Sequence, residues 1–194
     1  RLPFRRVRPD SLIADSREKC KIFPTTGDWL RDNLSGKSRA ERLQMNYHLG
    51  NIEMRDLSAY VRHFADRTIS DNLLFVPYPY SEDDARWWIR HVSEDPLRHR
   101  TNRAIRNSDG ALIGAIGVAG DFKEGSHKVE IGYWLATEYR GQGLMGAVIR
   151  EFCDGLFSEF SVVRIFATPF SRNTPSHRVL EKAGFVLEAR LRRS

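Results

Sequence analysis

The sequence predicts an α+β fold in which a mixed, mostly antiparallel central sheet is flanked by helices, and three features indicate it. Three consecutive segments between residues 101 and 136 have strand character, which favours antiparallel pairing of neighbours. Apolar residues recur at helical spacing on both sides of this block, over 55–70 and 144–157. Strands and helices alternate in the last third. The predicted order is β, α, α, three antiparallel β, α, β, α, β.

The first half of this order begins with a strand over residues 43–53. A helix over 55–70 follows, because its apolar residues lie three and four positions apart. A loop rich in proline and tyrosine covers 75–80. Ser81 then resembles a helix N-cap, with carboxylates in the first turn where the helix dipole favours them. The apolar stripe of this second helix consists of Ala85, Trp88, Ile89 and Val92.

The second half begins with a hairpin, because Ser108-Asp109-Gly110 is a typical turn between two strand-like segments. The segment over 162–169 is rich in β-branched residues, as expected of a buried strand. Gly184 ends the last predicted helix. The elements are strands over 101–107, 111–119 and 127–136, a helix over 144–157, a strand over 162–169, a helix over 173–183 and a strand over 185–193.

Residues 1–42 are predicted to be a basic extension, and residues 43–194 to form one domain. Prolines and glycines interrupt the short apolar groups of the extension, and no period is sustained. It holds eleven basic and six acidic residues, a balance of +5, whereas the net charge of the whole chain is +6. The basicity therefore belongs to the extension and not to a face of the folded core.

Composition excludes several classes of protein. Hydrophobic residues make up 41% and charged residues 29% of the chain, as in globular proteins. No apolar run approaches the roughly 20 residues that a membrane span needs, and the first residues lack the apolar centre of a secretory signal. Cys20 and Cys153 are too few for a disulfide framework or a metal site. We expect core packing for Cys153, no metal, no membrane partner, and a reducing, cytoplasmic location.

A glycine-rich turn connects the third central strand to the helix over 144–157, and it reads Arg140-Gly141-Gln142-Gly143-Leu144-Met145-Gly146. A helix N-terminus binds phosphate because its first N–H groups lack partners within the helix and the dipole adds positive potential. Glycines let a ligand approach the backbone, and Arg140 offers a charge-assisted contact. The alternative is a glycine-rich connection that binds nothing.

Two further segments accompany this turn. Val-Glu-Ile-Gly-Tyr-Trp-Leu (129–135) precedes it, and Asn-Thr-Pro-Ser-His-Arg-Val-Leu-Glu-Lys-Ala-Gly-Phe (173–185) follows the next strand. Together the three segments resemble the GNAT superfamily of acetyltransferases, in particular its branch of ribosomal-protein N-terminal acetyltransferases (RimJ and RimL). The family's turn has the form (Q/R)-x-x-G-x-(G/A), from which this chain departs at Met145. A Rossmann fold is excluded because the turn follows antiparallel hairpins.

The resemblance covers roughly residues 50 to 193 and implies a GNAT-like sheet that binds acetyl-CoA as co-substrate. It implies that Arg140 to Gly146 hold the pyrophosphate and that the backbone of Trp134 and Leu135 pairs with the pantetheine arm. A backbone N–H near Leu135 is the candidate donor to the oxyanion. Asn173 is expected to touch the cofactor and to cap its helix. The sheet is expected to open beside Pro169.

The resemblance also implies an enzyme that transfers the acetyl group by direct attack of a primary amine, either a peptide N-terminus or a small molecule. Glu130 is the candidate base, since it shares a strand face with Gly132 and Trp134, and the alternative is a solvated carboxylate. Ser176 is the candidate acid for the departing thiolate, because the tyrosine that many relatives use for this role is Leu180 here. The alternative for Ser176 is an ordinary polar residue in a first helical turn.

Two other functions stay open. A catalytically silent CoA-binding module would keep the glycine turn and use the basic extension to recruit a partner. A nucleic-acid-binding protein would depend on residues 1–42 and bind in a salt-dependent manner. The location of the charge argues against binding of nucleic acid by the core.

The acceptor itself is not readable from the sequence. The loop over 75–80 and the helix that bears Trp87 and Trp88 occupy the region that lines the acceptor groove in relatives. We expect core packing for Trp88, whereas Tyr78 and Tyr80 can either hold an acceptor or pack.

One edge of the sheet is expected to lack a partner. Members of the family continue past a strand such as 185–193 with a last strand that completes the sheet, and this sequence stops at Ser194. A second subunit can cover such an edge, so a homodimer is a hypothesis with a physical reason.

Overall fold

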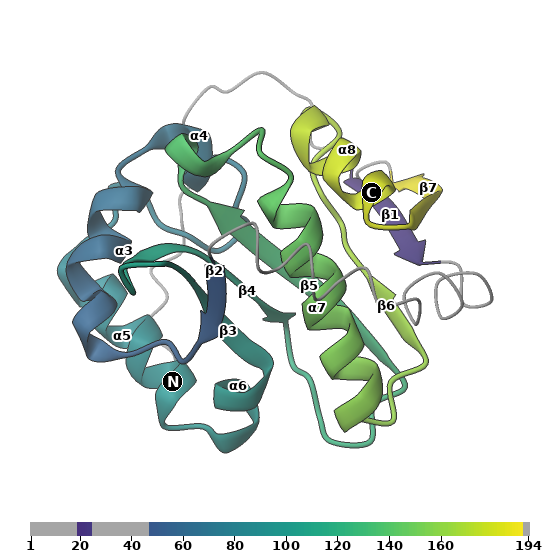
Figure 1. Cartoon of the computed structure of the whole chain (residues 1–194), viewed down its shortest axis with the longest axis horizontal. Coiled ribbons are helices and arrows are strands. Elements are labelled where there is room, and N and C mark those ends of the chain that lie inside the picture. Colours follow the sequence, from purple (N-terminus) through teal and green to yellow (C-terminus); the bar gives the residue numbers. More distant parts are fainter. Residues whose placement is uncertain (1–18, 25–46, 192–194) are drawn as a thin grey trace.

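The structure is a computed structural model that describes residues 19–24 and 47–191 (Figure 1). Its elements follow the predicted α+β order, with additional short helices and one additional strand. They are β1 (Lys19–Pro24), β2 (Tyr47–Gly50), the 3-10 helix η1 (Met54–Asp56), α3 (Leu57–Phe64), α4 (Arg67–Ser70), α5 (Glu82–Ser93), α6 (Pro96–Thr101), β3 (Asn102–Asn107), β4 (Leu112–Ala119), β5 (Lys128–Leu135), the 3-10 helix η2 (Thr137–Tyr139), α7 (Leu144–Glu159), β6 (Arg164–Phe166), α8 (Thr174–Lys182) and β7 (Phe185–Leu191).

Five strands form the main sheet, in the order β2-β3-β4-β5-β6. Neighbours from β2 to β5 are antiparallel, and β5 and β6 are parallel. The predicted hairpin joins β3 and β4: the N–H of Asn107 donates to the C=O of Ala111 over 3.1 Å, and Gly110 has a φ of 79° that favours glycine. The mixed, mostly antiparallel sheet and its three central strands are therefore confirmed.

An apolar cluster covers each face of this sheet. On one face, α7 lies across β4 and β5 and contributes Val148 and Ile149, both fully buried, to a cluster that includes Ile131 (Figure 1). On the other face, α3 and α5 pack against Trp134, whose ring centroid lies 5.1 Å from that of Phe64 in an edge-on arrangement. Each such aromatic pair contributes about 0.5–1.5 kcal/mol beyond the apolar area that it buries.

The predicted single helix over 55–70 is wrong. The chain forms η1 and α3, ends α3 at Phe64, and starts α4 at Arg67. The break lies at Asp66, whose backbone is extended with a ψ of 112° and whose carboxylate accepts the N–H of Thr68 over 2.8 Å. An aspartate that caps a new helix therefore interrupts the helix, although the apolar periodicity of the sequence continues through the break.

Three other elements also differ from the prediction. Of the predicted strand over 43–53, β2 covers Tyr47–Gly50, and residues 43–46 lie outside the described residues. Helix α6 was not predicted, although its signals are present: Asp95 caps it through two backbone N–H groups, and Pro96 stands in its first turn. The predicted strand over 162–169 shortens to β6, because the chain leaves β5 after Phe166.

Strand β1 comes from the predicted extension and pairs antiparallel with β7, from Lys19 opposite Leu191 to Pro24 opposite Phe185. It also lies near β6. Six residues of the segment 1–42 are thus part of the folded unit, and the others lie outside the described residues. The β7 edge contacted by β1 therefore has a partner within the chain, and the homodimer stays a prediction.

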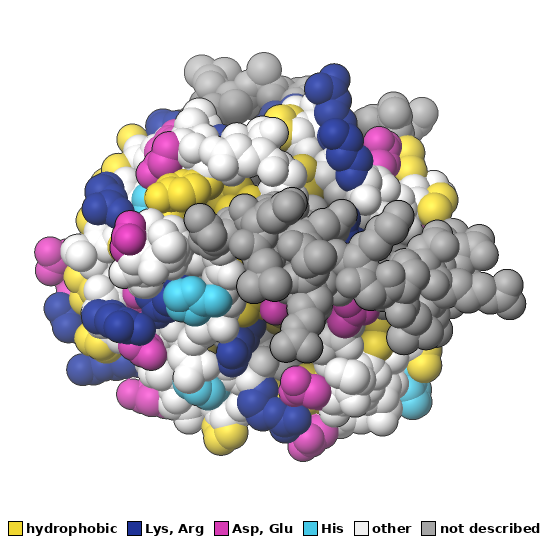
Figure 2. All heavy atoms as spheres, viewed as in Figure 1, with side chains coloured by type: hydrophobic (Ala, Val, Ile, Leu, Met, Phe, Trp, Pro, Cys, Tyr) yellow, Lys and Arg dark blue, Asp and Glu magenta, His cyan; other side chains and the backbone are white. Residues whose placement is uncertain are grey.

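Acidic and basic side chains are interspersed over the described part of the face shown in Figure 2. None of the described helices is long and apolar enough to cross a membrane. Within the same residues, no three histidine, cysteine or acidic side chains are grouped so as to hold a metal ion. Cys153 is fully buried in the α7 cluster, as predicted, and burial raises the pKa of its thiol.

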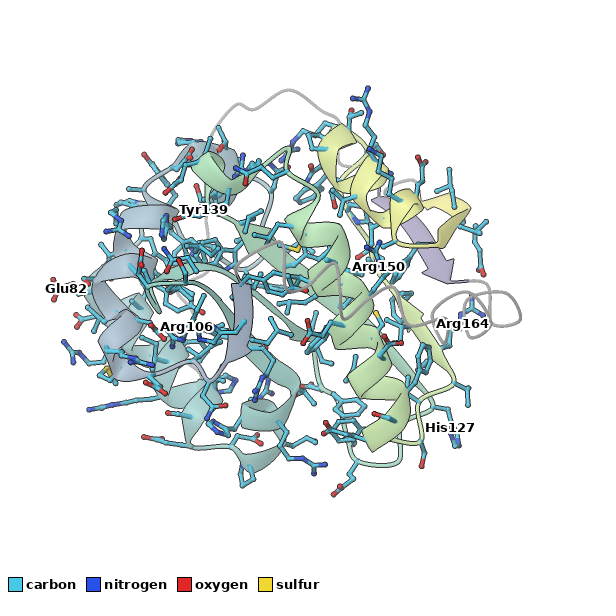
Figure 3. The ribbon with its side chains drawn as sticks, in the orientation of Figure 1. Glu82, Arg106, His127, Tyr139, Arg150 and Arg164 are labelled. Carbon is cyan, nitrogen blue, oxygen red and sulfur yellow. The ribbon has the colours of Figure 1, made fainter. Side chains whose placement is uncertain are left out.

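One ion pair lies in the interior, between β3 and the start of α3. Arg106, labelled in Figure 3, is 2% exposed and donates to both carboxylate oxygens of Asp56 over 2.8 Å. It also donates to the C=O of Asn51 over 2.7 Å. This bidentate geometry fixes the loop after β2 against β3.

Candidate active site

The sheet opens between β5 and β6. Their parallel pairing ends at Glu130 and Phe166, after which β5 continues to Leu135 with β4 as its partner. The opening begins three residues before Pro169, so the predicted opening beside this proline is confirmed. It leaves the backbone edge of the second half of β5 available to a ligand.

The strand register shows which backbone groups face this opening. The N–H of Ala136 donates to the C=O of Ile113 on β4 over 2.8 Å. Because the backbone groups of an antiparallel strand alternate in direction, those of Trp134 also face β4, whereas those of Tyr133 and Leu135 face the opening. The expected pairing of a ligand with the Trp134 backbone does not fit this register, and Tyr133 provides the groups on that edge instead.

The glycine turn lies where β5 ends and α7 begins. Gly141 and Gly143 have φ values of 77° and 79°, and a Cβ on either would meet no atom within 4 Å. Gly143 caps α7 without a side-chain hydrogen bond. In the described part of the chain, no backbone acceptor is found for the N–H groups of residues 141–145. The turn therefore presents unpaired donors and open space at the N-terminus of a 16-residue helix.

The two long polar side chains of the turn have partners within the fold. Arg140 donates from Nε to the C=O of Leu135 over 3.0 Å and from a terminal nitrogen to the hydroxyl of Thr68 over 3.1 Å. Gln142 donates to the C=O of Glu138 over 3.2 Å. These bonds fix the turn against β5 and α4. The residues of the turn that follow, Leu144, Met145 and Gly146, are buried at the start of α7.

Helix α4 is further tied to this region through Asp66. Its carboxylate accepts the hydroxyl of Thr137 over 2.8 Å, in addition to capping α4. The Thr137 bond is the largest cause of the lowered pKa of the Asp66 carboxyl; burial opposes it, and the bonds from Thr68 lower the pKa further. A negative carboxylate and Arg140 thus hold α4 beside the end of β5.

Glu130 lies at the apex of the opening and is half-buried. Its carboxylate accepts a hydrogen bond from the hydroxyl of Thr168, in the segment after β6. Trp134, four residues further along the strand and on the same face, belongs to the cluster of α3 and α5, whereas Val129 and Ile131 belong to the cluster of α7. The predicted division of β5 into two faces is confirmed, and Glu130 points toward the side of α3 and α5.

Ser176 approaches β5 from the side of α7. Its N–H donates to the side chain of Asn173 over 3.2 Å, so Asn173 is the N-cap of α8 as predicted. Its hydroxyl lies 2.7 Å from the hydroxyl of Tyr133, which is directed toward the α7 cluster. Burial raises the pKa of the Tyr133 phenol, so this group stays protonated at neutral pH. Glu130 and Ser176 therefore flank the second half of β5 on opposite faces.

Thr168 and Tyr133 were not predicted to take part in the site. The alternation of side chains along β5 places Tyr133 on the face that α7 covers, but its contact with Ser176 depends on how α8 packs. Thr168 meets Glu130 only because β6 is parallel to β5. Both contacts join segments more than thirty residues apart in sequence, so no local pattern indicates them.

The aromatic residues near the predicted acceptor region divide into packed and exposed side chains. Trp88 packs against the cluster of α3 and α5, as predicted, and Tyr80 packs at 4.7 Å from Phe64. Tyr78 is 52% exposed, with the guanidinium of Arg67 4.3 Å from its ring centroid. Tyr80 thus belongs to the core, and Tyr78 is available at the surface.

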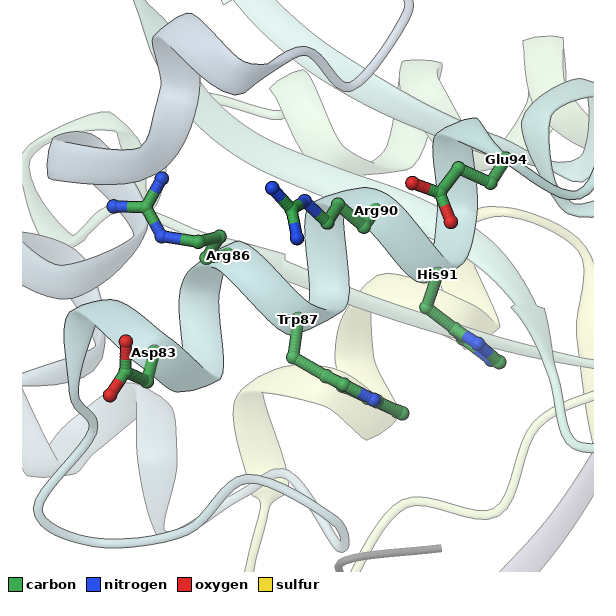
Figure 4. Close-up of a pocket in the computed structure, with 6 residues that line it drawn as sticks. All are labelled: Asp83, Arg86, Trp87, Arg90, His91 and Glu94. Carbon is green, nitrogen blue, oxygen red and sulfur yellow. The ribbon is translucent and has the colours of Figure 1, made fainter.

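A separate hollow of about 370 Å³ lies along the outer surface of α5 (Figure 4). Within it, Trp87 stacks on His91 with ring centroids 4.7 Å apart. Its lining residues come from α5 and the C-cap of that helix, and none belongs to the sheet opening or the glycine turn. They are Asp83, Arg86, Trp87, Arg90, His91 and Glu94.

The sequence is similar to those of known proteins. The chain is 33% identical over 84 residues to the "Putative ribosomal N-acetyltransferase YdaF" of Bacillus subtilis, an alignment that covers 43% of this chain and 45% of YdaF. It is 32% identical over 132 residues to the prophage-derived uncharacterized N-acetyltransferase YokL of Bacillus subtilis, covering 66% of this chain and 70% of YokL. The chain thus spans about half the length of YdaF.

The fold also matches solved structures. The structure of Mycobacterium smegmatis RimJ in complex with CoA-disulfide superposes with a TM-score of 0.59 at 22% identity, and the match covers 70% of this chain and 68% of RimJ. The two proteins therefore share a fold. The profile of the acetyltransferase (GNAT) domain matches residues 48–186. The chain belongs to the GNAT acetyltransferase family.

Proposed function

We propose that this protein is an acetyl-CoA-dependent N-acetyltransferase that acts on a primary amine. The observation that carries the proposal is the opening between β5 and β6 directly beside a turn with unpaired N–H groups, in a chain of the GNAT family. A pyrophosphate needs several donors and positive potential, and the start of α7 offers both. When bound, acetyl-CoA supplies the activated acetyl thioester.

The N–H groups of residues 141–145 hold the pyrophosphate in this account. The glycines at 141 and 143 leave room for it, since a Cβ there would occupy open space in front of the donors. The N–H and C=O of Tyr133 bind the pantetheine arm along the open edge of β5, next to the N–H of Leu135 on the same edge. Arg140 fixes the C=O of Leu135, so its first role is to hold the edge in place. Asn173 acts through its cap of α8.

Glu130 accepts the proton of the attacking amine. It lies three residues from Tyr133, which is about 10 Å along an extended strand, so transfer through water fits better than direct contact. The hydrogen bond from Thr168 orients the carboxylate toward the opening. The N–H of Leu135 faces the same opening and stabilises the oxyanion that forms on attack.

Ser176 gives a proton to the departing thiolate. A thiol has a reference pKa near 8.5, so a neighbouring hydroxyl need only assist modestly. Because Ser176 and Glu130 lie on opposite faces of β5, the amine can enter from the side of α3 and α5 while the sulfur leaves toward α8.

The acceptor class is a peptide N-terminus or a small-molecule amine. The description of YdaF as a ribosomal acetyltransferase and the relation to RimJ favour a peptide N-terminus. Tyr78, which is 52% exposed, contacts such an acceptor in this proposal. The alternative function, a silent CoA-binding module, uses the same turn and opening without Glu130 and Ser176.

Binding and turnover of acetyl-CoA test the proposal together. Calorimetry measures acetyl-CoA binding, and thiol release with a panel of amines and peptide N-termini measures transfer. We expect Glu130→Gln to lower kcat by about a hundredfold or more and Ser176→Ala by about ten- to a hundredfold.

Two exposed residues provide matched controls. Glu124→Gln changes a carboxylate that is 76% exposed, and Ser158→Ala removes a hydroxyl that bonds within α7; both should leave kcat unchanged. Binding without turnover on any amine would support the silent module, and the absence of binding would exclude both functions.

A further inference from the structure

We infer that Tyr133 is a positioning residue for the transfer: its phenol donates to the Ser176 hydroxyl and thereby directs the Ser176 hydrogen toward the departing sulfur. This inference rests on the proposed function, in which Ser176 is the acid. It assigns a role to a side chain on β5 that the glycine turn and the Glu130 site leave without one.

The contact is short and built from two rigid elements. The Tyr133 and Ser176 hydroxyl oxygens are 2.7 Å apart, a normal length for an O–H···O hydrogen bond. Tyr133 lies in the part of β5 that has left β6, and its ring packs against the buried cluster of α7. Ser176 lies in the first turn of α8, where its N–H is fixed by the Asn173 cap. Neither hydroxyl therefore depends on a mobile side chain to meet the other.

Either hydroxyl can be the donor in this bond, and the role of Tyr133 requires that the phenol donates. A serine hydroxyl has one hydrogen and can accept two bonds, and a tyrosine hydroxyl is equally able to donate. The phenol hydrogen has two acceptors nearby, the hydroxyl of Ser176 at 2.7 Å and its C=O at 3.5 Å. The nearer acceptor forms the stronger bond.

The serine hydrogen is then left for a ligand. Helical serines often donate to the C=O four residues earlier, which here would be that of Arg172. Among the described residues, Tyr133 is the one hydrogen-bond partner found for the Ser176 hydroxyl. With the phenol as donor, the Ser176 hydrogen has no acceptor in this part of the protein and points away from Tyr133.

The chemistry of the transfer uses this arrangement. The amine nitrogen forms a bond to the acetyl carbon and loses a proton, through water, to Glu130. The carbon–sulfur bond then breaks, and the sulfur takes the proton of Ser176. The negative charge left on the serine oxygen is stabilised by the hydrogen bond from Tyr133 until solvent returns a proton, and Glu130 releases its own proton to solvent. The net result moves one proton from amine to thiol and needs no further reactant.

The substitution Tyr133→Phe removes the hydroxyl and keeps the ring in the cluster. We expect kcat to fall by about tenfold, while the KM for acetyl-CoA changes by less than about twofold, since the backbone of Tyr133 is retained. Tyr47→Phe is the matched control, because its hydroxyl donates to Glu151 over 2.9 Å on the far edge of the sheet, and it should leave kcat unchanged. Thermal unfolding of both variants shows whether packing is preserved.

A double-mutant cycle with Ser176→Ala decides the inference. If Tyr133 acts through Ser176, then Tyr133→Phe has no further effect in the Ser176→Ala background. The inference would be overturned if the losses of kcat in the two single variants multiplied in the double variant, or if Tyr133→Phe alone kept full kcat. Either result would leave the acid role of Ser176 intact. A Ser176→Ala variant with full kcat would instead contradict the proposed acid, and with it the role of Tyr133.

Discussion

Asp56 and Glu188 each bind an arginine, in opposite surroundings. The Asp56–Arg106 pair is almost fully buried, with side chains 4% and 3% exposed, whereas Glu188 and Arg164 are each 47% exposed. Water screens the exposed pair and competes for its hydrogen bonds, so such pairs contribute about 0–1 kcal/mol. A buried arginine that loses its partner keeps its charge in the interior, where water does not reach it.

Asp56→Asn is therefore expected to lower the free energy of unfolding by about 3–5 kcal/mol, because the Arg106 charge stays buried without a counter-charge. Glu188→Gln, which removes the partner of the exposed arginine, is expected to cost less than about 1 kcal/mol. Urea denaturation of the two variants measures the difference. Equal losses of unfolding free energy would show that Arg106 reaches water or another acidic side chain.

A glycine with a positive φ precedes helix α7, and another ends the turn between β3 and β4. Gly143 and Gly110 share a φ of 79°, and a Cβ at either position would meet no protein atom within 4 Å. In conformational terms the two sites are equivalent. They differ in what lies in front of them, since Gly143 adjoins the unpaired donors of the α7 N-terminus.

Gly143→Ala and Gly110→Ala should each lower stability by about 1 kcal/mol, the cost of the left-handed conformation for a residue with a Cβ. Only Gly143→Ala should weaken the binding of acetyl-CoA, by about tenfold or more, as expected when one charge-assisted hydrogen bond is lost. Calorimetry on both variants separates the two effects. Equal affinities for acetyl-CoA would place the pyrophosphate elsewhere.

Local patterns predicted most elements but not their contacts. The hairpin at Gly110, the cap at Asn173 and the two faces of β5 follow from residue type and alternation, and the structure confirms them. Two further local signals are present in the sequence: a capping aspartate inside an apolar period, at Asp66, and a proline in a first helical turn, at Pro96.

Other features depend on tertiary structure. The pairing of β1 with β7 joins opposite ends of the chain, and the direction of the Trp134 backbone depends on the register with β4. The meeting of Tyr133 with Ser176 depends on the position of α8. The sequence motifs therefore indicate the family and the glycine turn, whereas the geometry of the acid and base requires the fold.

Taken as a whole, the molecule is a sheet that opens once along β5, with a helix N-terminus at the end of that opening. The two apolar clusters hold α7 and the α3–α5 layer on opposite faces of the sheet. In the proposed mechanism, the base and the acid act from different faces of β5. The hollow on α5 lies outside this arrangement.

The most direct measurement of the central claim is a backbone amide NMR titration of the ¹⁵N-labelled chain with acetyl-CoA. The account predicts that the largest chemical-shift changes occur at Leu135, Gly141, Gly143 and Met145, where N–H groups face the opening or the start of α7. Largest changes at Trp87 and His91 on the outer surface of α5, or no changes at saturating acetyl-CoA, would contradict it.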